Sequence, residues 1–211
     1  MDEPLSNLDA KLRVQTRAEL IKLHERVNTT TIYVTHDQIE AMTMGDRIAV
    51  MSLGVLQQLD TPQNLYDHPA NKFVAGFIGS PSMNFVDVAL QAADGRIYAV
   101  TPGFKMRVPD LKGRALEQHV GQTVTLGVRP EHLVEHSRLG GTAPPDATIP
   151  VTVDIIETLG NELFIYLTSG SVLLTSRMAP DIRLHRGQQI EVAAPPDKLY
   201  FFDPTTEEKI A

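Results

Sequence analysis

The hydrophobic pattern of this 211-residue sequence changes its period at Gly79-Ser80-Pro81-Ser82. Before this stretch the apolar residues recur at helical spacing, and after it they form short alternating runs separated by glycine, proline, aspartate and asparagine. We therefore predict two domains: residues 1–80, built as α/β, and residues 81–211, an all-β barrel or sandwich. The strands expected in the second domain are Phe85–Leu90, Arg96–Val100, Phe104–Val108, Thr123–Val128, Ile149–Ile155, Leu163–Leu167, Val172–Thr175, Gln189–Ala193 and Leu199–Phe202.

The first domain has a mixed pattern. Apolar residues at helical spacing predict a helix over Ala10–Val27, with Asn28 as its stop. The β-branched run Thr30–Thr35 shows little alternation, which is typical of a strand buried on both faces. Asp37-Gln38-Ile39-Glu40 has the form of a capping box and predicts a short helix after it. Further on, the sequence predicts a hairpin over 46–59 and short helices from Thr61 and over Asn71–Ile78.

Three motifs stand in the first 37 residues: Asp2-Glu3-Pro4, Ser6-Asn7-Leu8-Asp9 and Thr35-His36-Asp37. In this order and spacing they resemble the end of the Walker B strand, the D-loop and the switch histidine of ABC-transporter ATPases. The first domain thereby resembles part of a P-loop ATPase domain.

The resemblance implies a role for each motif in phosphoryl transfer, where the protein supplies positioning and electrostatics. Asp2 would hold Mg²⁺ through its water shell, and Glu3 would be the general base that activates the attacking water. His36 would reach the γ-phosphate of ATP. Asp9 would lie at the seam between two ATPase subunits. Read singly, Asp2-Glu3-Pro4 is also compatible with a solvated acidic terminus, and His36 with a histidine that only caps the next helix.

The second domain resembles the regulatory domain of carbohydrate-importer ATPases, such as those of the maltose and glycerol-3-phosphate importers. The matching stretches are Met83-Asn84-Phe85, 126–132 (LGVRPEH) and Glu157-Thr158-Leu159-Gly160. This implies an OB-like barrel that helps to hold two ATPase subunits together. The partners implied are a second ATPase subunit, in a homodimer, and two membrane permeases.

Neither a G-x-x-x-x-G-K-[ST] phosphate loop nor an LSGGQ-like signature occurs in the sequence. We therefore expect the chain to be the back portion of a longer ATP-hydrolysing subunit, and to be inactive toward ATP by itself. The transported solute cannot be predicted from this subunit.

Composition limits the classes of partner. The net charge is −7, and residues 83–211 carry 12 basic and 16 acidic side chains, which argues against nucleic acid as a ligand. The absence of cysteine excludes disulfides and thiol chemistry. No apolar run approaches the roughly 20 residues that span a bilayer. We expect a cytoplasmic protein, peripheral on the inner face of the membrane, without direct insertion.

Alternatives remain for the second domain. The chain could be a stand-alone, non-catalytic regulatory or dimerisation module, or a barrel of this kind that binds a small oxyanion through Arg129, although Glu131 would oppose an anion. Alternatively, Arg129 and Glu131 could form an ion pair within the barrel. The run His132-Leu133-Val134-Glu135-His136 matches a zinc-peptidase pattern, but it leaves barely one helical turn and has no companion ligand. The stretch Ser137–Pro145 is expected to be a mobile loop.

Overall fold

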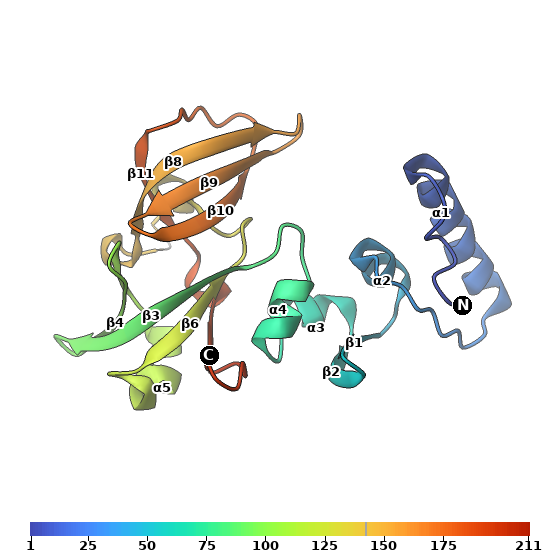
Figure 1. Cartoon of the computed structure of the whole chain (residues 1–211), viewed down its shortest axis with the longest axis horizontal. Helices are drawn as coiled ribbons and strands as arrows, with labels where there is room; N and C mark the ends of the chain where they lie inside the picture. Colours follow the sequence, from blue (N-terminus) through green and yellow to red (C-terminus); the bar gives the residue numbers. More distant parts are fainter. Residues whose placement is uncertain (142) are drawn as a thin grey trace. The chain divides into compact units, whose positions relative to one another are not determined.

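The computed structural model describes residues 1–141 and 143–211, and it divides into two compact units, Met1–Ala70 and Asn71–Ala211. Figure 1 shows the elements of both, and each unit is described by itself. One position of the predicted loop Ser137–Pro145, Thr142, lies outside the described residues.

The long helix of the first unit forms where the sequence predicts it, as α1 (Ala10–Val27). Asp9 is its N-cap, with a carboxylate oxygen that accepts the Leu12 N–H at 2.9 Å. Asn28 ends the helix in the left-handed conformation, with φ 50°, which asparagine tolerates better than most residues. No residue of α1 is buried, and Leu12, Leu23 and Val27 of its predicted apolar face are exposed.

The prediction of a buried strand over Thr30–Thr35 is wrong. Only an isolated parallel bridge between Asp2 and Val34 forms there, and the side chains of Ile32 and Val34 are 79% and 49% exposed. A parallel strand is stable inside a sheet with neighbours on both sides, and here only residues 1–3 run beside it. Residues 1–70 therefore do not form the parallel sheet of the expected α/β domain.

The rest of the first unit follows the predicted order of elements. These are α2 (Gln38–Met44), β1 (Ile48–Ser52), β2 (Val55–Asp60) and α3 (Pro62–Asp67). The strands β1 and β2 pair as an antiparallel hairpin, and its turn residues Leu53 and Gly54 both have positive φ. Such a turn matches the twist of the two strands it joins.

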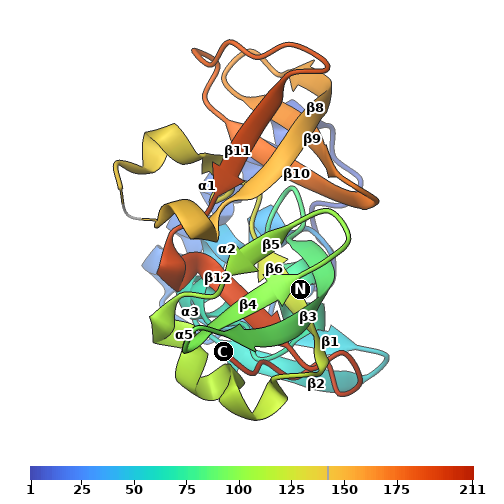
Figure 2. The same cartoon turned by 90° about the vertical axis from the view of Figure 1, so that its left-hand side faces the viewer.

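The second unit begins with α4 (Lys72–Phe77) and continues as two five-stranded antiparallel sheets. One sheet has the order β10-β9-β8-β11-β7 and the other β12-β6-β3-β4-β5. Figure 2 shows the two sheets one above the other. The strands are β3 (Asn84–Ala93), β4 (Arg96–Val100), β5 (Lys105–Arg107), β6 (Thr123–Val128), β7 (Val134–Glu135), β8 (Ile149–Thr158), β9 (Leu163–Ser169), β10 (Val172–Met178), β11 (Gln189–Ala193) and β12 (Leu199–Phe202).

All nine predicted strands of this unit are present, and one hydrophobic core draws residues from both sheets. The alternation of β9, in which every second residue from Leu163 to Ser169 is buried, shows the period of two that predicted it. The two-residue strand β7 and the helix α5 (Asp110–Leu116) were not predicted. The unit has the mostly β architecture that was expected of an OB-like barrel.

The side chain of Asn84 joins one sheet to the other. From β3 its amide nitrogen donates to the carbonyl oxygen of Thr175 in β10 at 2.8 Å, and its amide oxygen accepts the Thr175 N–H at 2.7 Å. The next outward N–H of β10, that of Arg177, donates to the carbonyl of Pro130 at 2.9 Å. A side-chain amide thus takes the place of a neighbouring strand.

The helix α4 belongs to the second unit by its contacts. Ala75 packs with Met83, Tyr200 and Phe202, and the Lys72 N–H donates to the Glu207 carbonyl at 2.8 Å. The compact units divide after Ala70, ten residues before the boundary drawn from the sequence. The functional assignment of the two parts stays a prediction. Across residues 1–141 and 143–211, no helix has both the length and the apolar character to cross a membrane.

Candidate functional site

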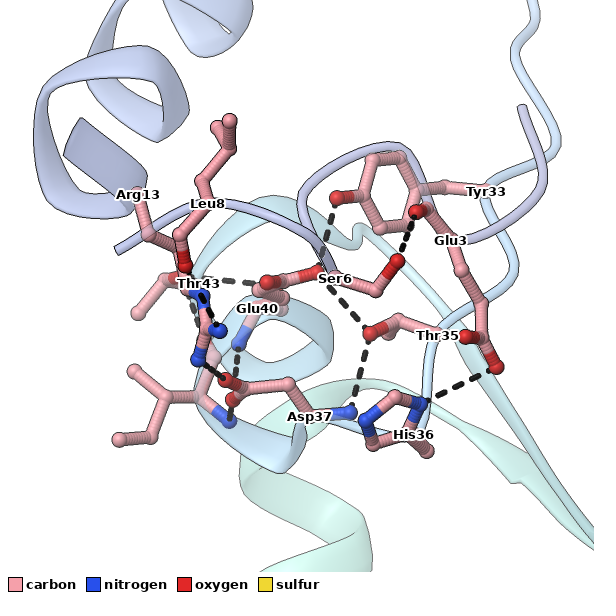
Figure 3. Close-up of polar contacts among 11 residues, drawn as sticks. Glu3, Ser6, Leu8, Arg13, Tyr33, Thr35, His36, Asp37, Glu40 and Thr43 are labelled. Carbon is pink, nitrogen blue, oxygen red and sulfur yellow. Dashed lines mark hydrogen bonds and ion pairs between the residues drawn. The ribbon is translucent and has the colours of Figure 1, made fainter. Parts of the chain in front are cut away.

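Two of the residues predicted to act on ATP lie together in the first unit. His36 Nδ1 is 3.1 Å from Glu3 Oε1, and both side chains are exposed to solvent, by 73% and 44% (Figure 3). The backbone brings them together, because the Glu3 N–H donates to the Val34 carbonyl and the Val34 N–H donates to the Met1 carbonyl, each at 2.9 Å. The two segments that carry the pair therefore run side by side.

The carboxylate of Glu3 raises the pKa of His36 above its ordinary value of 6.5, first through the hydrogen bond and then through its charge. Partial burial acts against this shift, and Asp37 and Glu40 add to it. The pair can therefore hold a proton on the imidazole at a higher pH than an isolated histidine would.

The turn after Glu3 holds its backbone in place. Ser6 Oγ donates to the Glu3 carbonyl at 2.9 Å, and the Leu8 N–H donates to the Leu5 carbonyl at 3.2 Å. Leu5 is 1% exposed, so the turn also has a buried side chain to anchor it. Glu3 itself has φ 42°, a conformation that is uncommon for a residue with a side chain. The predicted D-loop segment thus supports the conformation of the predicted base.

Asp2 and Asp9 are not joined to this pair by any hydrogen bond or ion pair described in residues 1–141 and 143–211. Asp2 is exposed and forms the bridge to Val34, and Asp9 caps α1. In the described part of the chain, no group of three or more histidine, aspartate or glutamate side chains could hold a metal ion. The assignment of Asp2 to Mg²⁺, through water, stays a prediction.

A polar network behind His36 was missed by the sequence analysis (Figure 3). Glu40 of α2 is 3% exposed, and its Oε2 accepts the hydroxyls of Tyr33 at 2.8 Å and Thr35 at 2.9 Å. Of the predicted capping box only one half forms: Asp37 accepts the N–H groups of Ile39 and Glu40, while Glu40 turns to the hydroxyls. The signal for this network was the pair of hydroxyl side chains two residues apart before His36.

Arg13 of α1 connects this network to the turn. Its Nη1 lies 3.5 Å from Asp37 Oδ2, and its Nη2 donates to the Leu8 carbonyl at 3.2 Å. Both side chains of the ion pair are about a quarter to a third exposed, so the contribution to stability is small. The arginine thus links α1 both to the turn before it and to the N-cap of α2.

The other candidate sites of the sequence analysis have structural roles in the second unit. The side chain of Arg129 is 1% exposed, and its Nη1 donates to the carbonyls of Ile78 at 2.5 Å and Ala75 at 3.5 Å, so it caps α4. This burial and these partners disfavour Arg129 as a ligand for an oxyanion. In the run 132–136, Glu135 accepts the Ser137 hydroxyl, and His136 Nε2 lies 3.0 Å from the Ala143 carbonyl.

Two family models match the second unit. The MalK OB fold domain matches residues 79–133, and the TOBE domain matches residues 126–202. The matched regions together include all ten strands of the two five-stranded sheets.

Relatives match the chain along its whole length. A trehalose/maltose import ATP-binding protein of Thermococcus litoralis is 46% identical over 212 residues, which is 100% of this chain and 56% of the relative. A multiple sugar-binding transport ATP-binding protein of Streptococcus mutans is 44% identical over 225 residues, 100% of this chain and 58% of the relative. An osmoprotective compounds uptake ATP-binding protein of Synechocystis is 44% identical over 211 residues, covering 100% and 57%. The chain thus spans little more than half the length of each of these relatives.

Proposed function

We propose that this chain is the C-terminal portion of the ATP-hydrolysing subunit of a carbohydrate importer. The proposal is supported by its similarity, over its whole length, to ATP-binding subunits of sugar importers. The observation that supports the catalytic part of this proposal is the pair of Glu3 and His36, with Oε1 and Nδ1 3.1 Å apart. These residues lie 33 positions apart in the sequence, and they are the two that the motifs assign to the same γ-phosphate.

In the proposed reaction, the carboxylate of Glu3 accepts a proton from the attacking water, and the His36 ring donates a hydrogen bond to the γ-phosphate. Asp2 would hold Mg²⁺ through water, and the ion would neutralise charge that develops on the phosphates. The raised pKa of His36 favours its protonated form, which suits contact with an anion. Asp9 would face the second ATPase subunit.

The partners and the location are part of the same proposal. Two such subunits would assemble beneath a pair of membrane permeases on the cytoplasmic face, and closure of the ATP-bound dimer would open the transport path. The relatives' names state different cargoes, from trehalose and maltose to osmoprotective compounds. Because these cargoes differ, the proposal names carbohydrates as the class of solute and does not name a particular one.

The test is the substitution Glu3→Gln in the complete subunit. The amide keeps the shape of the side chain but cannot act as a base, so hydrolysis should fall by roughly 10²–10⁴-fold. ATP should still bind, and an ATP-bound dimer should accumulate and be visible by light scattering. The control is His185→Gln, which changes an exposed residue of the second unit. Hydrolysis at the parent rate in Glu3→Gln would contradict the assignment of the base.

A further inference from the structure

Glu40 is the one charged residue in residues 1–70 that is buried, with 3% of its surface exposed. A buried carboxylate is costly unless hydrogen bonds satisfy it. The hydroxyls of Tyr33 and Thr35 supply these bonds, at 2.8 and 2.9 Å from Oε2. Glu40 therefore holds two residues of the segment that leads to His36.

The Thr35 hydroxyl also connects Glu40 to the residue that follows His36. While its hydrogen points to Glu40, its oxygen accepts the N–H of Asp37 at 2.9 Å. Both sequence neighbours of His36 are thus linked to the Glu40 carboxylate, one directly and the other through the same hydroxyl. Figure 3 shows this chain of bonds behind the histidine.

Packing cannot position the His36 ring, because 73% of its side chain is exposed. Burial alternates along the segment: Tyr33 and Thr35 face inward to Glu40, whereas Val34 and His36 are exposed. The direction of the ring is set by the backbone at 35–37 and by the contact with Glu3.

We infer that Glu40 is a positioning residue for His36, acting through the Thr35 hydroxyl to keep the imidazole within reach of Glu3 and of the γ-phosphate. The inference rests on the proposed function, since it assigns Glu40 a part in ATP hydrolysis. Burial and the bond to Glu40 also raise the pKa of Tyr33 well above its usual value of 10. The Tyr33 hydroxyl consequently remains a donor throughout the working pH range.

The first experiment uses this chain and follows the His36 ring by NMR through a pH titration. Thr35→Val keeps the shape of the side chain and removes the hydroxyl, so the contact with Glu3 should loosen and the pKa of His36 should fall toward 6.5. Thr35→Ser restores the hydroxyl and should restore the parent pKa. Glu40→Leu should behave as Thr35→Val does, and Glu19→Gln, on the exposed face of α1, is the control.

A double substitution separates positioning from general loosening of the fold. In a Glu3→Gln background Thr35→Val should not lower the pKa of His36 further, because the partner carboxylate is already gone. Glu40→Leu also removes a charge that raises this pKa directly, so in that background it should lower the pKa by less than it does in the parent. A parent pKa in both Thr35→Val and Glu40→Leu would overturn the inference. If Glu40→Leu does not fold, the comparison of Thr35→Val with Thr35→Ser decides alone.

The second experiment uses the complete subunit. Displacement of a reacting group by about 1 Å can cost on the order of 10²-fold in rate, so Glu40→Leu should lower kcat by about tenfold to a hundredfold with little change in KM for ATP. In a His36→Ala background Glu40→Leu should have no further effect on kcat. If His36→Ala hydrolyses ATP at the parent rate, the proposed function fails. If His36→Ala is impaired and Glu40→Leu is not, only the role of Glu40 is overturned.

Discussion

The guanidinium of Arg129 donates from Nη1 to the carbonyl oxygen of Ile78 at 2.5 Å, and so ties the end of α4 to the core between the sheets. The last carbonyls of a helix have no partner within the helix. A cation at this end satisfies them and interacts favourably with the helix dipole. The arginine that the sequence offered as an anion ligand caps this helix.

Arg129→Leu should destabilise the second unit by about 1–3 kcal/mol, because it leaves buried carbonyl groups without their donor. Urea unfolding monitored by circular dichroism measures this loss. Arg186→Leu is the matched control, since Arg186 is 82% exposed and pairs with Asp154 at the surface. Equal midpoints for the two variants would contradict the capping role.

Two glycines of the second unit should respond in opposite ways to alanine. A Cβ at Gly103 would lie 2.1 Å from the carbonyl oxygen of Ser169, so Gly103→Ala should cost about 1–3 kcal/mol or more. A Cβ at Gly113 of α5 would meet nothing within 4 Å, so Gly113→Ala should stabilise by up to about 1 kcal/mol. Thermal unfolding of both variants beside the parent tests the pair, and a stabilised Gly103→Ala would refute the close approach.

The pH dependence of the Glu3–His36 pair has a definite sign. The pKa of His36 is higher in the folded chain than the 6.5 of an unfolded one, so the pair stabilises the fold at pH values below 6.5. This contribution is lost as the pH rises through the folded pKa. NMR titration should give a midpoint above 6.5 for the parent and a lower one for Glu3→Gln. An unchanged midpoint in Glu3→Gln would show that the contact does not persist in solution.

Limited proteolysis should remove the first unit before it cuts the second. Residues 1–70 contain only four buried apolar side chains, Leu5, Val50, Leu65 and Pro69, and α1 has none. Segments with so little buried surface open locally at small cost. Trypsin should therefore cut first in α1, at sites such as Lys11 and Lys22, and then at the exposed Arg47, which leaves a fragment that begins at Ile48. Mass spectrometry of the fragments checks this, and early cuts after Asn71 would show the opposite order.

The elements that the sequence predicted well are those specified by local patterns. α1 has its predicted bounds because Asp9 and Asn28 supply both caps, and the nine strands follow from alternation that the core between the sheets enforces. Thr30–Thr35 was mispredicted because a run of β-branched residues records a preference for an extended backbone, whereas burial depends on neighbouring strands. The helix α5 was missed because Gly113 interrupts its short helical pattern.

The site was predicted in part. The motifs named Glu3 and His36, which the structure places 3.1 Å apart. The role of Glu40 could not be predicted, because a glutamate at the fourth position of a capping box usually returns to the backbone. Here the Thr35 hydroxyl takes the Asp37 N–H, and Glu40 is left to bind hydroxyls. Such a choice between partners depends on tertiary geometry that sequence spacing does not contain.

The amide of Asn84 has a consequence for how copies of this chain meet. β10 is an outer strand of its sheet, and an outer strand with free N–H and C=O groups can accept an extended segment of another molecule. On β10 the outward groups of Thr175 are already bonded to Asn84, and the N–H of Arg177 to Pro130. These groups are therefore not available to an extended segment of another molecule, which shortens the length of β10 over which intermolecular β-sheet growth could begin.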